Sequence, residues 1–306
     1  MNHGPTSHPP KLFPRIAAAL ALVGALVVNS LAQSIPLGGR TTGELSALYP
    51  NAVVPVGATF SIWGVIYLGL VAWSVVQFLP SAARTGSRIA ILFALTSAWN
   101  AGWILAWHYL LPGLSVVIML TLLATLVLLH LRLEDAEGAG HAGAAPGAPA
   151  GVEAAGAAAA GGARTSTWPL ALARAAFGLY LGWILVATVV NITAWLVSLG
   201  WGGWGLSDGT WGALVAGVGV AVAFMVQRRF VNPAIGAAAA WGFLGTAAAG
   251  AGLGGGANVA GAGVDAVGVA GGGGLAAVSV VAGLGALILL ADGVRIFLVR
   301  RRSLSP

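Results

Sequence analysis

Long apolar runs recur along the whole chain, and they constrain its fold more than any other feature of the sequence. Each run approaches the roughly 20 helical residues that cross a bilayer core about 30 Å thick. Backbone polar groups in lipid must hydrogen-bond within their own segment, so each run is predicted to be a helix. We predict an all-α, polytopic membrane bundle with spans at 16–32, 59–79, 89–108, 114–131, 170–199, 211–227, 234–253 and 275–298.

Composition excludes a soluble globule. Of the 306 residues, 58% are hydrophobic and 7% are charged, whereas soluble domains carry about 25% charged residues. The chain has no cysteine, which excludes disulfides, thiolate catalysis, iron–sulfur clusters and cysteine-ligated zinc. The net charge of +6 lies in short clusters beside the apolar runs. We therefore expect the lipid bilayer, and no nucleic acid, as a partner.

The basic residues predict how the helices cross the membrane. If the N-terminus lies in the cytoplasm, every Lys and Arg except Arg40 falls on the cytoplasmic side of the eight predicted spans. This alternation follows the positive-inside rule, and a miscounted span would disrupt it. We expect both termini in the cytoplasm and the chain in a bacterial cytoplasmic membrane.

The first apolar run has two interpretations. Lys11 and Arg15 precede it and Ser30-Leu31-Ala32 ends it, a pattern that also fits a cleaved signal peptide. The run is slightly long for a signal-peptide core, and Pro14 stands where a helix start tolerates proline. A retained helix is therefore the favoured interpretation.

The predicted spans divide the chain into three parts. A cytoplasmic tail at 1–15 precedes a five-helix bundle at 16–199, and three further helices with a Gly-rich loop follow at 200–306. Residues 136–167 are poor in large side chains, so we expect a flexible cytoplasmic loop there. The Gly-rich segment 249–274 fits either an external loop or a partly embedded one.

Three predicted helices each carry aromatic rings and hydrogen-bonding groups on one face. Successive helical residues lie about 100° apart, so the residues that share a face follow from their spacing. On the second, third and fifth helices, large rings lie on the same side as a few amides and hydroxyls. The candidate ligand-binding residues are Trp63, Tyr67, Asn100, Trp103, Trp107, Tyr180, Trp183, Ala187 and Asn191.

These faces have two interpretations. Amides in hydrocarbon need partners, so the faces are expected to turn inward, where ring planes with sparse donors suit a flat, mostly apolar ligand. Alternatively, the amides and hydroxyls only join neighbouring helices and the rings pack as a core. Helix periodicity alone leaves both interpretations open.

Three sequence segments on these helices resemble a known family. They are PVGATFSIWGVIY at 55–67, AWNAGW at 98–103 and YLGWILVATVVNITAW at 180–195. In this order they are similar to the second-helix entry, third helix and fifth helix of the translocator protein family, also called TspO/MBR or tryptophan-rich sensory proteins. The resemblance covers residues 16–199.

The resemblance implies a TspO-like five-helix bundle that binds porphyrins and other tetrapyrroles and, in animal members, cholesterol and synthetic ligands. By matching position, it implies a cavity lined by Trp63, Asn100, Trp103, Tyr180, Trp183, Ala187 and Asn191. Ile192 and Leu196 replace the Tyr and Arg of the family's sterol motif, so a cholesterol site is not expected. Three helices follow residue 200, so a divergent, extended member is expected.

We expect a membrane receptor or sensor that binds a hydrophobic small molecule. Its ligand would be a porphyrin or another tetrapyrrole such as haem, with no required cofactor and no catalytic residue. The alternative is a transporter or permease subunit, which the added helices and the even number of spans favour. A scaffold for another membrane protein is a third hypothesis. The oligomeric state, a homodimer included, stays open.

The remaining polar residues predict local packing. The five histidines show no metal-ligand spacing, so no metal site is expected. His108 is an axial-ligand candidate for a bound tetrapyrrole, although an interfacial role is favoured. Asp292 and Arg295, three residues apart on the last helix, predict an ion pair. Asp208 is predicted to cap the sixth helix.

Overall fold

The computed structural model describes residues 12–35, 39–40, 42–46, 48–142, 168–253 and 272–303, and these ranges contain helices and no β-strand. Each of the eight predicted spans corresponds to one long helix. The long helices of the described chain are α1 (Leu12–Ser34), α3 (Ile62–Val76), α4 (Gly86–His108), α5 (Pro112–Ala142), α7 (Trp168–Ser198), α8 (Asp208–Phe230), α9 (Pro233–Gly250) and α10 (Gly272–Ser303). The predicted all-α bundle is confirmed.

Seven of these helices are long and apolar enough to cross a membrane. The second of them consists of α3 together with the 3-10 turn Gly57–Ser61 that leads into it. The exception is α9, which has 18 residues and in which alanine and glycine dominate. Their small side chains lower its hydropathy but let it approach its neighbours closely.

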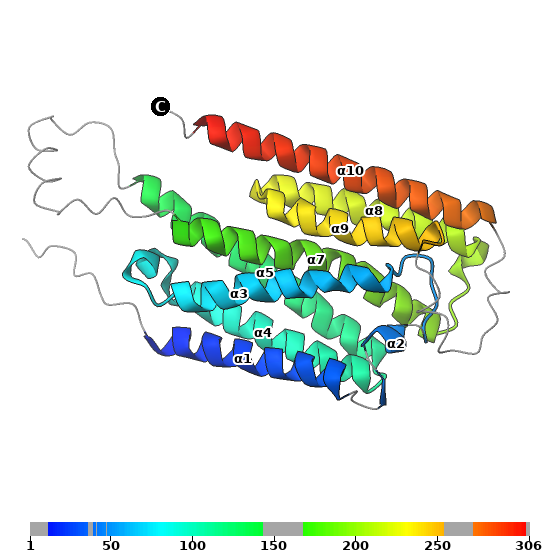
Figure 1. Cartoon of the computed structure of the whole chain (residues 1–306), viewed down its shortest axis with the longest axis horizontal. Coiled ribbons are helices and arrows are strands. Elements are labelled where there is room, and N and C mark those ends of the chain that lie inside the picture. Colours follow the sequence, from blue (N-terminus) through cyan, green and yellow to red (C-terminus); the bar gives the residue numbers. More distant parts are fainter. Residues whose placement is uncertain are drawn as a thin grey trace, which may run out of the picture.

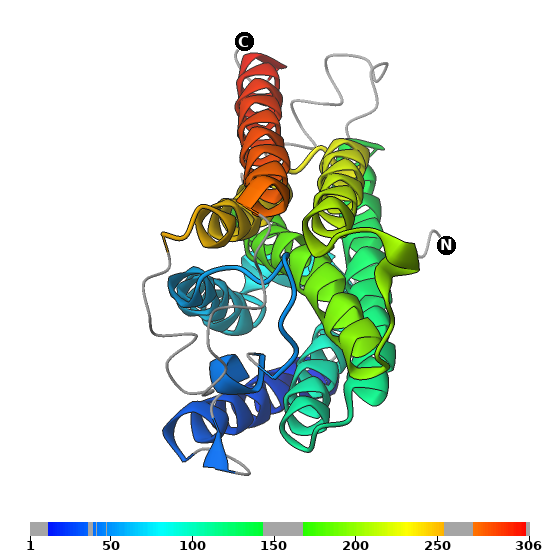
Figure 2. The ribbon, with the colours of Figure 1, turned by 90° about the vertical axis from the view of Figure 1, so that its right-hand side faces the viewer.

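The long helices form two groups that meet at α7. The five-helix group contains α1, α3, α4, α5 and α7, whereas α8, α9 and α10 pack together against one side of it (Figures 1 and 2). The most completely buried long helix is α7, because it contacts α3 and α5 on one side and α8 and α9 on the other. It therefore connects the two groups.

Glycines allow α7 and α9 to approach each other closely. A Cβ atom on Gly182 would collide with the carbonyl oxygen of Ile235, and one on Gly178 would collide with the side chain of Asn232. Gly178 and Gly182 are four residues apart and so lie on one face of α7. Small residues at this spacing are typical of close helix contacts in membranes.

Arginine side chains tie helices together at one end of the bundle. Arg15 at the start of α1 donates to the carbonyl oxygens of Gln77 and Ala82, which follow α3. Arg174 near the start of α7 donates to the carbonyl oxygen of Phe230 at the end of α8. The alternating helix directions in Figure 1 bring these ends together, in agreement with the predicted alternation.

The predicted ion pair of Asp292 with Arg295 is wrong, because Asp292 pairs with Arg228 of α8 instead. The Nη2 atom of Arg228 lies 2.5 Å from Oδ1 of Asp292, and its Nε atom donates to Oδ2 at 3.1 Å. Gln227 donates to the same carboxylate at 2.8 Å. A two-point guanidinium–carboxylate contact across helices outcompetes a partner one turn away on the same helix.

Two helix ends also differ from the predictions. The N-cap of α8 is Ser207, whose hydroxyl accepts from the Thr210 N–H at 3.3 Å, and Asp208 is the first helical residue. Helix α5 continues to Ala142, through the first residues predicted as a flexible loop. The pair of Glu137 with Arg174 at 2.8 Å holds this extension against α7. The rest of that predicted loop lies outside the described residues. So do the N-terminal residues 1–11 and the Gly-rich residues 254–271.

Candidate ligand-binding site

A cavity of about 460 Å³ lies inside the five-helix group. It is lined by the second half of α1, the start of α3, the end of α4 and the second half of α7, together with the short helix α2 (Thr42–Ser46). These segments all lie in the half of the bundle remote from Arg15 and Arg174. Small-molecule sites in proteins usually occupy about 300–1,000 Å³, so this cavity has the size of a binding site.

Seven of the nine residues predicted from the helix faces line this cavity. They are Trp63, Tyr67, Trp103, Trp107, Trp183, Ala187 and Asn191. The other two, Asn100 and Tyr180, are buried behind its wall, each with 2% of its surface exposed. The structure therefore brings the three faces together, and binding of a ligand to them stays a prediction.

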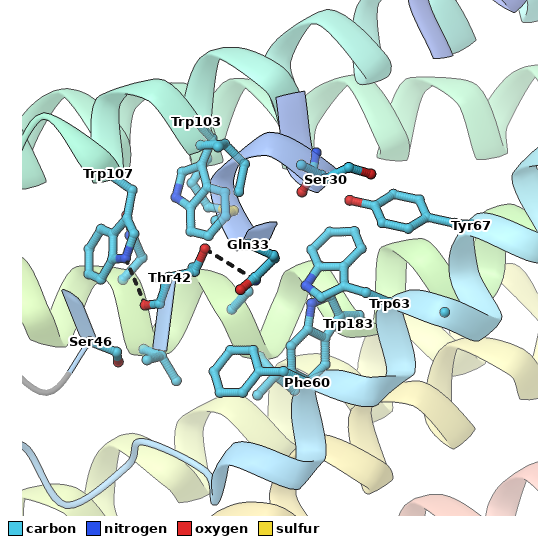
Figure 3. Close-up of a pocket in the computed structure, with 18 of the residues that line it drawn as sticks. Ser30, Gln33, Thr42, Ser46, Phe60, Trp63, Tyr67, Trp103, Trp107 and Trp183 are labelled. Carbon is cyan, nitrogen blue, oxygen red and sulfur yellow. Dashed lines mark hydrogen bonds between the residues drawn. The ribbon is translucent and has the colours of Figure 1, made fainter. Parts of the chain in front are cut away.

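Aromatic rings from α3 and α7 make one wall of the cavity (Figure 3). Trp63 stacks on Tyr67 with ring centroids 5.1 Å apart, and it meets Trp183 edge to face at 6.2 Å. Phe60, just before α3, packs edge to face on Trp183 at 5.7 Å. The rings fix one another's orientation, so the wall is formed without a ligand.

Trp103 and Trp107 of α4 add a second pair of rings. Their planes are nearly parallel, at 17°, with centroids 6.1 Å apart. The indole N–H of Trp107 donates to the carbonyl oxygen of Thr42 at 3.4 Å, which ties α4 to α2 (Figure 3). The cavity is thus bordered by indoles from three different long helices.

Helix α1 supplies a polar wall that the sequence analysis missed. Asn29, Ser30 and Gln33 line the cavity, and the Gln33 amide donates to the Thr42 hydroxyl at 3.4 Å (Figure 3). The sequence does contain a pattern that indicates this wall, because Asn29 and Gln33 are four residues apart and share one face of an apolar helix. Amides in lipid need partners, which predicts an inward face for α1 as well.

Asn100 and Tyr180 support the wall from behind. Asn100 accepts a hydrogen bond at 2.8 Å from the amide of Asn29, which itself lines the cavity. The ring of Tyr180 packs edge to face on Trp63 at 5.9 Å, and its hydroxyl donates to the carbonyl oxygen of Thr96 at 3.5 Å. Both side chains hold lining residues in place.

Three hydrogen-bond donors in the wall have no partner among the described residues. They are the Tyr67 hydroxyl and the indole N–H groups of Trp103 and Trp183. A buried donor without a partner costs about 1–3 kcal/mol. None of the described lining residues is charged. These three donor atoms have almost no exposed surface, so they do not face the open volume. The cavity offers ring faces and neutral side chains to a guest.

His108 and His130, the two histidines whose side chains the structure describes, lie apart from this cavity. His108 is buried with its Nδ1 atom 2.8 Å from the carbonyl oxygen of Ile104, and it does not line the cavity. His130 lies near the other end of the bundle, with its ring centroid 5.1 Å from that of Phe230. In the described part of the chain, no three His, Asp or Glu side chains converge as metal ligands would.

The fold and the cavity define a polytopic membrane protein with an aromatic-lined site inside its helix bundle. A family model described as TSPO-like protein matches residues 15–288, so the chain belongs to the TSPO-like family and is an integral membrane protein. The match continues beyond α7 through α8 and α9 and into α10. No curated protein and no solved structure matches the chain.

Proposed function

We propose that the chain is a membrane receptor that binds a flat, largely apolar ligand, a porphyrin or another tetrapyrrole, in the aromatic cavity. One observation carries the proposal. Indoles from α3, α4 and α7 surround a cavity of about 460 Å³ whose described lining carries no charged side chain. A ligand with a broad, flat ring system is stabilised by stacking on the indoles of such a wall.

The polar groups of the cavity support the same ligand class. The carboxylate substituents of protoporphyrin and haem accept hydrogen bonds, so they need donors at one side of the cavity. The hydroxyl of Ser30 and the amide of Gln33 border the cavity near α2. Polar substituents of the guest would lie on that side, and its ring system among the indoles.

Titration of the purified protein with protoporphyrin, haem and a sterol, followed by tryptophan fluorescence, tests the proposal. We expect the two tetrapyrroles to bind and the sterol not to bind. Trp63→Ala removes the ring that meets Tyr67, Tyr180 and Trp183. Loss of a stacking contact of about 1.5 kcal/mol should weaken porphyrin binding about tenfold.

Trp73→Ala is the matched control. Trp73 is a buried tryptophan of the same helix, packed edge to face on Phe177 at 6.1 Å, and it does not line the cavity. Its removal should lower stability without changing the dissociation constant for porphyrin. Equal losses of affinity in both variants, or no saturable binding by the unmodified chain, would contradict the proposal.

A further inference from the structure

Helix α9 lies outside the five-helix group but is hydrogen-bonded to the segment that leads into α3. We call residues 53–60 the entry segment. The indole N–H of Trp241 donates to the carbonyl oxygen of Thr59 at 2.8 Å, and the hydroxyl of Thr246 donates to the carbonyl oxygen of Val53 at 3.0 Å. In Figure 1 the blue loop before α3 reaches the yellow end of α9 at this contact.

The backbone of α9 makes a third bond to the entry segment. The N–H of Val56 donates to the carbonyl oxygen of Gly245 at 3.2 Å. A Cβ atom on Gly245 would collide with the side chain of Thr59, so this approach requires glycine. The contact is dry, because Val53, Thr59 and Thr246 are each at most 3% exposed.

The entry segment also forms part of the cavity. Pro55 and Phe60 line it, and Phe60 packs on the ring of Trp183. Helix α9 backs a second part of the wall, because a Cβ atom on Gly242 would lie 2.8 Å from the side chain of Val186, another lining residue. The same face of α9 thus contacts the cavity wall at two places.

The entry segment takes part of its backbone hydrogen bonding from α9. Residues 53–56 are not helical, so their N–H and C=O groups have no regular intrahelical partners. Unpaired backbone groups are costly inside a membrane protein. Local bonds satisfy some of these groups: the N–H of Val53 bonds to the side chain of Asn51 at 3.2 Å, and the carbonyl oxygen of Thr59 accepts from the N–H of Ile62. Helix α9 supplies the partners of Val53 O and Val56 N and a second partner for Thr59 O.

We propose that Trp241 and Thr246 are positioning residues that hold the entry segment in its ligand-retaining conformation. Through them the group α8–α10 controls how quickly a ligand leaves the cavity of the five-helix group. The kinetic part of this inference rests on the proposed function. Its structural part, immobilisation of the entry segment by α9, does not depend on the ligand.

Two substitutions remove the side-chain bonds: Thr246→Val is nearly isosteric, and Trp241→Phe keeps an aromatic ring but is smaller. In the double variant, protoporphyrin should dissociate about tenfold faster in a stopped-flow displacement experiment followed by porphyrin absorbance. Thr246→Ser keeps the hydroxyl and should retain the slow rate. Trp168→Phe, at a ring that is 45% exposed and begins α7, controls for loss of a tryptophan.

A second measurement does not need a ligand. Because the chain has no cysteine, Ala58→Cys creates a single labelling site on the exposed side of the entry segment. A nitroxide attached there should give an immobilised spectrum in the otherwise unmodified chain and a mobile one in the double variant, with Thr246→Ser again like the unmodified chain.

The two measurements separate the inference from the proposed function. If no tetrapyrrole binds the unmodified chain, the proposed function fails, and the nitroxide spectra still decide whether α9 immobilises the entry segment. If the ligand binds but the double variant shows the same dissociation rate, control of ligand release by α9 is refuted. Unchanged nitroxide mobility in the double variant refutes immobilisation of the segment by these bonds.

Discussion

Asn29 and Asn100 illustrate how single amides act within this bundle. The Asn29 amide donates to Asn100 at 2.8 Å and to the carbonyl oxygen of Ala25 in its own helix at 2.8 Å. This pair joins α1 to α4 directly behind the cavity. It also orients Asn29, so a residue that does not line the cavity determines the position of one that does.

A double-mutant cycle measures this contact. Asn29→Ala and Asn100→Ala should each lower the free energy of unfolding in detergent, and the double variant should lose less than their sum. We expect a coupling energy of about 0.6–1.7 kcal/mol, the range of interhelical hydrogen bonds in membranes. Strictly additive effects would mean that the two amides do not stabilise the contact between α1 and α4.

At the scale of elements, α7 and α9 form the joint between the two helix groups. Their contact depends on glycine, because Gly182 leaves no room for a side chain against the backbone of Ile235. Hydropathy predicts a weak span for α9, yet this helix carries the contacts that hold the entry segment. Small side chains weaken its tendency to enter lipid and at the same time permit these close approaches.

Gly182→Ala should therefore separate α7 from α9. Overpacking of this kind costs about 1–3 kcal/mol, which thermal or denaturant unfolding of the detergent-solubilised protein would measure. Gly24→Ala on α1 is the matched control, because a Cβ atom there would meet no other atom within 4 Å, and the change should be neutral or slightly stabilising. Equal destabilisation by both substitutions would contradict the proposed role of the joint.

At the scale of the whole molecule, the helices alternate in direction and bring Arg15, Arg174 and Arg228 to one end. Arg40 lies in the chain between the end of α1 and the start of α2. The positive-inside rule predicts that the arginine-rich end faces the cytoplasm. The cavity then lies in the half of the bundle that faces outward.

Labelling of single introduced cysteines tests this orientation. Leu206→Cys, just before α8, should react with a membrane-impermeant maleimide in intact cells, because it lies at the outward end. Ser81→Cys, an exposed residue just after α3, should react only after the membrane is opened. The cysteine-free unmodified chain is the background control. The opposite labelling pattern would invert the predicted topology.

Much of the candidate site was predictable, because its signals are local. Trp63, Trp183 and Asn191 each lie on helix faces that periodicity alone identifies, and all three line the cavity. Asn100 lies on such a face too, but it bonds to the amide of Asn29 instead of lining the cavity. Asn29 belongs to α1, which packs on α4 but is far from it in the sequence. Periodicity predicts that a face turns inward, and it does not predict which side chain of another helix meets it.

The sequence alone determined the number, positions and alternating directions of the helices, since hydropathy and charge act within each segment and on its membrane flanks. Only the tertiary structure decided which faces meet: the polar wall from α1, the partner of Asp292 on α8, and the hydrogen bonds from α9 to the entry segment. These contacts join residues far apart in the chain, such as Thr59 and Trp241, and depend on side-chain shape at close approach, which no local pattern encodes.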